Sequence, residues 1–170
     1  MLDAVVTVDG RAAVRFERRL RHPVEAVWRA VTEPGELGHW FPAEVTADLR
    51  PGGAMSFRFR DDDAPPTEGR VTEYDPPRRF AFTWGGAVLR FELEPDDGGD
   101  ACRLTFTAMP EEPEAAARDA AGWHVCLDVM ERHLAGAPAE APGGEPTDDW
   151  RRRYEEYAER RFPTGAPVPD

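Results

Sequence analysis

A chain of 170 residues is long enough to form one domain with its own hydrophobic core, and it leaves little room for two. Its 33 acidic and 21 basic side chains give a formal net charge of -12, the wrong sign for general binding to nucleic acid or to anionic membranes. Residues 1–10 lack the basic and apolar character of a signal peptide, and no later segment approaches the roughly 20 apolar residues of a membrane span, so we expect a cytoplasmic protein.

The first elements that the sequence predicts are one strand and two short helices. Ala12–Arg21 alternates apolar and charged side chains, the period of a half-buried strand, although Arg18 interrupts the apolar side. Pro23 stands where a helix favours its first residue, and apolar side chains then recur at helical spacing. Pro34 begins a second, very short helix that turns Trp40 inward.

From Ala43 onward the chain predicts an antiparallel meander of short strands. Turn sequences rich in glycine, proline and aspartate separate the strands, and each strand alternates apolar and polar side chains. The apolar faces carry many aromatic rings: Phe57, Phe59, Phe80, Phe82, Trp84, Phe91 and Phe106. A sheet with one apolar face needs another element to cover it.

The covering element is predicted over Pro113–Ala135, as a long amphipathic helix. Trp123 and Leu127 belong to its apolar stripe. Asp119 falls within the same stripe, and Gly122 stands in mid-helix, where glycine costs about 1 kcal/mol relative to alanine. A helix that only filled a core would carry larger apolar residues at these two positions, so we expect unfilled volume beside its first half.

Composition divides the chain into a domain over residues 1–136, a linker rich in proline, glycine and alanine over 137–146, and a helical tail over 147–170. The tail helix, Thr147–Phe162, carries three aromatic side chains on one side: Trp150, Tyr154 and Tyr157. Three large rings on a surface helix are rarely left in water, so we expect the tail to dock on its own domain or on a second subunit in a homodimer.

Five segments, in this order, resemble bacterial members of the heat-shock protein 90 ATPase activator C-terminal-like family. They are Pro23–Trp40, Leu49–Gly53, Glu68–Pro77, Phe82–Trp84 and Gly122–Asp128. The family belongs to the START superfamily of polyketide cyclases and lipid-transport proteins. The resemblance implies an α+β helix-grip fold, in which a seven-stranded curved antiparallel sheet wraps around a long C-terminal helix and two short helices follow the first strand. It also implies a cavity that takes a hydrophobic small molecule in many relatives.

Metal and cofactor sites are not expected. The four histidines and two cysteines show no His-x-x-x-His or Cys-x-x-Cys spacing, and the chain has no phosphate loop, dinucleotide fingerprint or nucleophile elbow. We therefore assign no catalytic residue, no metal ligand and no cofactor. Cys102 and Cys126 stand at apolar positions, where buried reduced thiols are expected.

The candidate ligand-binding residues are those that the pattern places between the sheet and the long helix. They are Trp40, Phe57, Phe82, Trp84, Phe91, Asp119, Trp123 and Leu127. Asp119 has two readings: a polar group at the cavity mouth whose pKa is raised by desolvation, or a partner for one of the many arginines.

Three classes of function follow. The first is binding of a hydrophobic, aromatic or acyl molecule in an apolar void. The second is a cyclase or hydrolase that acts on such a molecule, for which the sequence offers Asp119, His124, Arg18 and His39 as titratable or charged groups. The third is a chaperone-assisting protein, which would need an exposed apolar patch. The small number of titratable groups favours binding.

Overall fold

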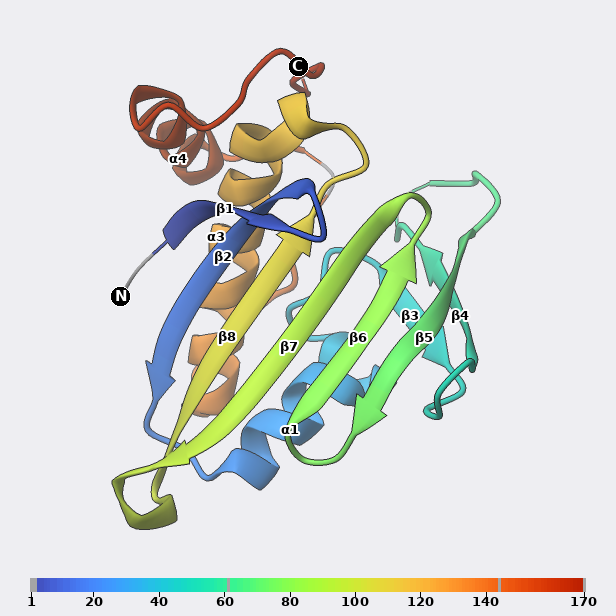
Figure 1. Ribbon diagram of the computed structural model, residues 1–170, viewed down its shortest axis with the longest axis vertical. Coiled ribbons are helices and arrows are strands. Elements are labelled where there is room, and N and C mark those ends of the chain that lie inside the picture. Colours follow the sequence, from blue (N-terminus) through green and yellow to red (C-terminus); the bar gives the residue numbers. More distant parts are fainter. Residues whose placement is uncertain (1–2, 61, 144, 170) are drawn as a thin grey trace.

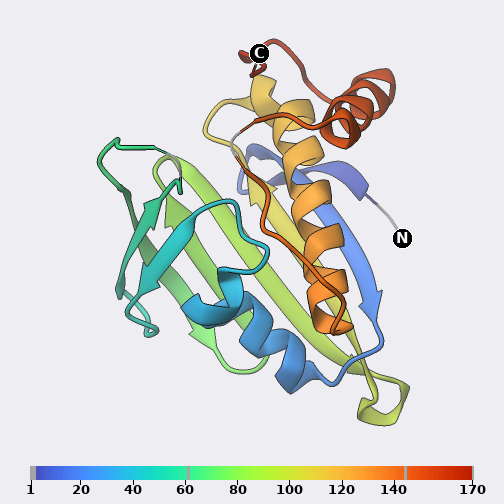
Figure 2. The same ribbon diagram turned by 180° about the vertical axis from the view of Figure 1, so that it is seen from behind.

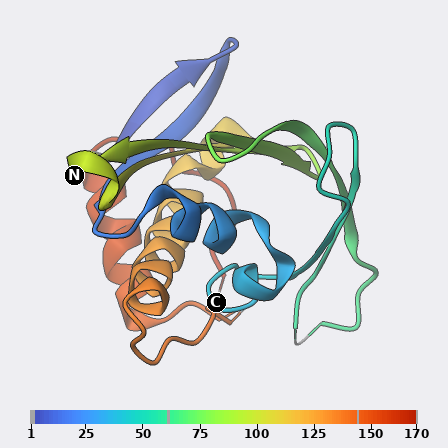
Figure 3. The ribbon, with the colours of Figure 1, turned by 90° about the horizontal axis from the view of Figure 1, so that it is seen from below.

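The fold is a single curved sheet with its helices on the concave side. The computed structural model in Figure 1 describes residues 3–60, 62–143 and 145–169. Seen from below, the sheet arches over the helices (Figure 3). This arrangement confirms the predicted α+β class and the grip of the sheet on the long helix. The predicted domain, linker and tail include residues 1, 2, 144 and 170, which lie outside the described residues.

Eight strands form the sheet, in the spatial order β1-β2-β8-β7-β6-β5-β4-β3, and every neighbouring pair is antiparallel. The strands are β1 Asp3–Val8, β2 Arg11–Leu20, β3 Glu44–Ala47, β4 Ala54–Arg58, β5 Thr67–Asp75, β6 Arg79–Trp84, β7 Ala87–Asp96 and β8 Ala101–Met109. The helices are α1 Val24–Thr32, α2 Pro34–Leu37, α3 Ala116–Leu134 and α4 Asp148–Glu159, with 3-10 turns at Asp97–Gly99 and Pro113–Ala115. No helix of the described residues is long and apolar enough to cross a membrane.

The prediction of seven strands is wrong by one, because β1 is an additional edge strand. It pairs with β2 through a tight turn at Asp9 and Gly10, whose φ angles are 50° and 76°. Positive φ at both central residues is the geometry of a type I′ hairpin, which Asp-Gly favours. No side chain of β1 among the described residues is fully buried; Ala4, Val6 and Val8 on one side are only partly buried, which is typical of an edge strand.

Aromatic side chains fill the middle of the concave face. Trp40 follows α2 and packs edge-on against Phe91 of β7, and its indole N–H donates to the carbonyl of Ala30 at 2.8 Å. Phe82 of β6 stacks beside Phe91. Side chains from α1, α2 and the segment that follows therefore occupy the hollow of the sheet and make this part of the molecule a solid core.

The first half of α3 is lined with small side chains. Ala116, Ala117, Ala120 and Ala121 are all buried, and Gly122 follows them. Larger buried residues return only from Trp123 onward. The helix therefore fills much less volume at its N-terminal end than α1 and α2 fill at the middle of the sheet.

The tail docks on its own domain. Helix α4 lies beside α3, and the segment between them runs back along α3 (Figure 2). Thr147 caps α4, since its hydroxyl accepts from the Trp150 N–H at 3.1 Å. The ring of Tyr157 is 2% exposed, and Trp150 stacks on Tyr154 with 5.5 Å between the ring centroids.

Candidate ligand pocket

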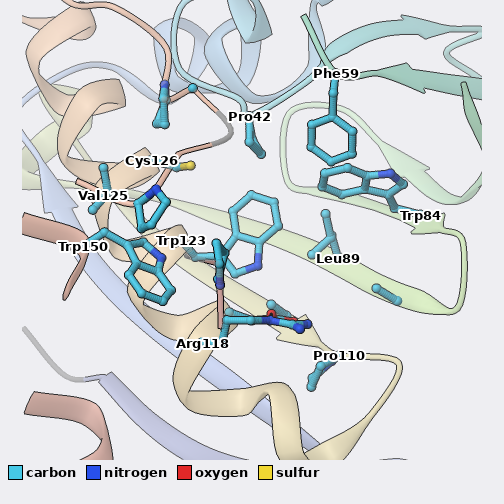
Figure 4. Close-up of a pocket in the computed structure, with 18 of the residues that line it drawn as sticks. Pro42, Phe59, Trp84, Leu89, Pro110, Arg118, Trp123, Val125, Cys126 and Trp150 are labelled. Atoms are coloured by element: carbon cyan, nitrogen blue, oxygen red, sulfur yellow. The ribbon is translucent and has the colours of Figure 1, made fainter. Parts of the chain in front are cut away.

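A pocket of about 400 Å³ opens between the first half of α3, the ends of β6, β7 and β8, and the C-terminal segment. Figure 4 shows it in close-up: Trp84 and Phe59 lie on one side, Trp150 and Val125 on the other, and Trp123 between them. This volume and an apolar lining with few polar groups are typical of small-molecule sites.

Three of the five tryptophans of the chain line this pocket. Trp84 ends β6, Trp123 belongs to α3 and Trp150 to α4, so three separate elements each supply one indole. The rings of Trp84 and Trp123 meet edge to face, with 6.2 Å between their centroids. Phe59 packs on Trp84 at 5.8 Å and remains 42% exposed, so it lies where the pocket meets solvent.

Small residues leave this space open. Ala108 of β8 and Leu89 of β7 are cross-strand partners on the pocket wall, and Gly122 lies opposite on α3. A Cβ atom added at Gly122 would meet only one neighbouring atom within 4 Å, Nε1 of Trp150 at 3.7 Å. The unfilled volume predicted beside Gly122 therefore exists, and Trp150 bounds it.

Part of the polar lining is a charged pair on α3, and Glu145 and Thr147 of the C-terminal segment also line the pocket. The Nε of Arg118 donates to Oδ1 of Asp119 at 3.0 Å, and Nη1 of Arg118 donates to the carbonyl of Pro167 at 3.2 Å. Burial raises the pKa of Asp119 above its ordinary value, and the guanidinium of Arg118 partly offsets this effect. Asp119 therefore has an arginine partner and also lines the pocket.

The thiol of Cys126 also lines the pocket, but its environment makes it unreactive. Burial raises the pKa of Cys126 to about 12, so the thiol stays protonated near neutral pH and is a poor nucleophile. Cys102 lies in β8 away from the pocket, and burial raises its pKa to about 11. Both cysteines are free and buried, as predicted.

The structure separates the eight predicted ligand-binding residues into two groups. Trp84, Asp119 and Trp123 line the pocket. The other five are at most 1% exposed and belong to the solid core: Trp40, Phe57, Phe82, Phe91 and Leu127. The physical reason is that Trp40 and the neighbouring Phe41 fill the hollow of the sheet, so the rings beneath them have no free face. These five side chains therefore lie outside the pocket.

Three further pocket residues, Trp150, Phe59 and Arg118, are not among those that the sequence predicts. The aromatic stripe of the tail predicts that Trp150 docks, but it gives no sign of which ring reaches the cavity. Alternation places Phe59 on the apolar face of its strand, whereas β4 ends at Arg58 and leaves the ring at the pocket mouth. For Arg118, its place next to Asp119 was the available signal.

The other groups considered for acid-base chemistry lie away from the pocket. Arg18 is 2% exposed and pairs with Asp3 at 2.7 Å beneath α4. His124 contacts the hydroxyl of Tyr157 at 2.6 Å on the same side of the molecule. The ring of His39 stacks on His133, with 4.2 Å between centroids. Among the described residues, no three His, Cys, Asp or Glu side chains cluster so as to hold a metal ion.

Comparison with known proteins assigns the family. Residues 21–135 match the family model described as activator of Hsp90 ATPase homolog 1-like protein. The chain belongs to this family. The fold of the family is known for binding hydrophobic ligands. No curated protein sequence matches the chain significantly.

Solved structures share the fold over most of the chain. The crystal structure of CalU16 from Micromonospora echinospora is 23% identical, with a TM-score of 0.70 and coverage of 94% of each chain. A solution structure from Bordetella parapertussis is 25% identical, with a TM-score of 0.68, and covers 94% of this chain and 95% of that one. Both matches cover 94% of this chain, so they extend beyond residues 21–135 of the family match.

A third structure, DynU16, is a protein of the dynemicin biosynthetic locus. It is 27% identical, with a TM-score of 0.62, and the match covers 74% of this chain and 48% of that one. The family and these three structures agree with the resemblance that the sequence motifs indicated.

Proposed function

We propose that this chain binds a small hydrophobic molecule in the pocket between α3 and the sheet. The observation that carries the proposal is the cavity of about 400 Å³, lined by three indoles and bounded by Gly122 and Ala108, in a fold whose other half is tightly packed. Large apolar walls with a few polar groups favour a flat apolar ligand, because burial of its surface supplies most of the binding free energy.

The Arg118–Asp119 pair supports a ligand with one polar end. The guanidinium offers hydrogen-bond donors, and Asp119, with its raised pKa, donates a hydrogen bond whenever it is protonated. A carbonyl, phenol or sulfonate group placed against this pair would find donors, while the rest of the molecule contacts the indoles. A ligand that lacks such a group would bind less tightly.

Asp119 also favours one second candidate, acid-base catalysis on the bound molecule. A carboxyl group whose pKa moves toward neutrality by burial is suited to proton transfer. Binding requires only that Asp119 form a hydrogen bond, whereas catalysis requires that it exchange a proton. Turnover of a bound ketide that is lost in Asp119→Asn, with binding retained, would favour catalysis.

We do not propose a chaperone-assisting role. The exposed large hydrophobic side chains among the described residues are Val5, Phe59 and Val168. Val5 lies in the edge strand β1, Phe59 at the pocket mouth and Val168 in the C-terminal segment. Three exposed side chains are too few to indicate a large apolar docking surface.

The binding proposal is tested with a variant that fills the pocket. Ala108→Leu adds a side chain from the pocket wall, and Ala54→Leu is the matched control, since it adds the same groups at an exposed position of β4. Binding of naphthalene-1-sulfonate is measured by calorimetry, and near-UV circular dichroism checks the packing of each variant.

We expect saturable binding to the native protein, at least about tenfold weaker binding to Ala108→Leu, and unchanged binding to Ala54→Leu. Equal binding to all three proteins would place the probe elsewhere. Absence of binding to the native protein would also contradict the proposal.

A further inference from the structure

The C-terminal segment supplies a wall of the pocket. Pro142, Pro146, Trp150 and Pro169 all line it, although they follow the residues 21–135 that match the family model. Among these, Trp150 has the largest side chain. Its indole faces Gly122 of α3: a Cβ atom at Gly122 would lie 3.7 Å from Nε1 of Trp150.

Contacts at two places fix the segment on the domain. Beyond α4, the carbonyl of Pro163 accepts from the N–H of Ala117 at 2.9 Å, which satisfies one of the free donors at the start of α3. Close by, the carbonyl of Pro167 accepts from Arg118, itself a pocket residue. The segment is thus bonded to the same helix turn that carries the polar pair of the pocket.

The second place lies under α4, around Tyr157. Its hydroxyl donates to Oδ2 of Asp3 at 3.0 Å and accepts from Nδ1 of His124 at 2.6 Å, since its single hydrogen is already used. Arg153 pairs with Asp128 of α3 at 3.1 Å. Trp150 stands seven residues before Tyr157, so both rings lie on the same face of α4 and one docking geometry positions both.

We propose that Trp150 is a ligand-contacting residue that determines the size of the ligand. This inference rests on the proposed function. The indole closes one side of the pocket against Gly122, so it adds aromatic contact for a small ring system and excludes a larger one. The tail of this chain is then part of the binding site as well as a covering element.

The test uses two probes of different size, naphthalene-1-sulfonate with two fused rings and pyrene-1-sulfonate with four. Their affinities are measured by calorimetry for the native protein and for Trp150→Ala, Trp150→Phe and Tyr154→Ala. Tyr154 is the control because its ring stacks on Trp150 but does not line the pocket. Circular dichroism and limited proteolysis show whether the tail stays docked.

Trp150→Ala should weaken naphthalene-1-sulfonate binding by about tenfold, the effect of one lost aromatic contact, and should strengthen the relative affinity for pyrene-1-sulfonate. Trp150→Phe should lie between the native protein and Trp150→Ala, and Tyr154→Ala should keep the native ratio of affinities. An unchanged ratio in Trp150→Ala would overturn the inference. So would an equal change in Tyr154→Ala, because the ratio would then report only a loosened tail.

The Ala108→Leu variant separates the two failures. If Ala108→Leu blocks both probes while Trp150→Ala keeps the native ratio, the pocket binds the probes and only the role of Trp150 is wrong. If Ala108→Leu binds both probes with the affinity of the native protein, the probes do not bind in the pocket. That result would contradict both the proposed function and the role of Trp150.

Discussion

Two regions of the same concave face are both rich in aromatic rings, yet one is solid and the other is hollow. Around Phe82 and Phe91, the side chains of α1, α2 and Trp40 press into the sheet and leave these rings unexposed. Around Trp84 and Trp123, the facing helix has Gly122 and the sheet has Ala108, and a pocket remains between them. The strands look alike in both regions, so the facing element decides whether the sheet encloses a core or a cavity.

The largest expected difference between the two regions is the cost of removing a ring. Phe91→Ala should lower the free energy of unfolding by about 3–5 kcal/mol, because it leaves a closed cavity in packed surroundings. Trp84→Ala should cost less, since that ring already borders open volume. Denaturant unfolding of both variants measures the difference. A loss for Trp84→Ala as large as that for Phe91→Ala would mean that the pocket end is packed as tightly as the core.

A glycine of the sheet gives the next contrast. A Cβ atom at Gly69 would lie 2.0 Å from the carbonyl oxygen of Thr83 and 2.7 Å from the ring of Phe57. Gly69→Ala should therefore lower the free energy of unfolding by about 1–3 kcal/mol, the usual cost of overpacking. Thermal unfolding checks this value. If Gly69→Ala left the free energy of unfolding unchanged, strands β5 and β6 would separate easily to admit the methyl group. The sheet there would then not be tightly packed, contrary to the contrast drawn between the solid and the hollow region.

Acid should weaken the attachment of the tail. Burial lowers the pKa of His124, and the nearby carboxylate of Asp128 opposes this effect. The unfolded chain then takes up a proton more readily than the folded one as the pH falls through about 6.5, so the free energy of unfolding decreases in that direction. The native protein should lose more stability between pH 7.5 and pH 5 than His124→Asn, whose amide can still donate to Tyr157.

Urea unfolding of the two proteins at both pH values measures that difference. Parallel loss of stability in the native protein and in His124→Asn would show that the titration of His124 does not couple to folding. Asp119, whose pKa is raised, contributes in the opposite sense, and it is present in both proteins, so its effect cancels in the comparison.

The smallest effect is expected at Gly122. Its Cβ atom would meet Nε1 of Trp150 at 3.7 Å, an ordinary contact, so the added methyl group fits. Gly122→Ala should raise the free energy of unfolding by about 0.5–1 kcal/mol through helix propensity. A marked destabilisation, measured by thermal unfolding, would mean that α3 and Trp150 already touch and that no space separates them.

The sequence predicted the fold in detail, since the alternation of the strands and the helical stripes report directly on burial. It missed β1, a short edge strand in which no side chain is fully buried and only Ala4, Val6 and Val8 form a partly buried side. It predicted open volume beside Gly122 and Asp119, where the pocket lies, and of the predicted ligand-binding residues Trp84, Asp119 and Trp123 line that pocket. Trp40, Phe82 and Phe91 lie in the packed core instead, because periodicity identifies the apolar face of a strand but not what packs against it.

The most direct test of the central claim uses the five tryptophans as reporters. Three line the pocket, while Trp28 lies on α1 and Trp40 is bonded to Ala30 in the core. Naphthalene-1-sulfonate is titrated into 15N-labelled protein, and the indole N–H signals are followed by NMR. We predict that the signals of Trp84, Trp123 and Trp150 shift saturably while those of Trp28 and Trp40 stay in place. Equal shifts of all five signals, or no shift of the three, would contradict a ligand site between α3 and the sheet.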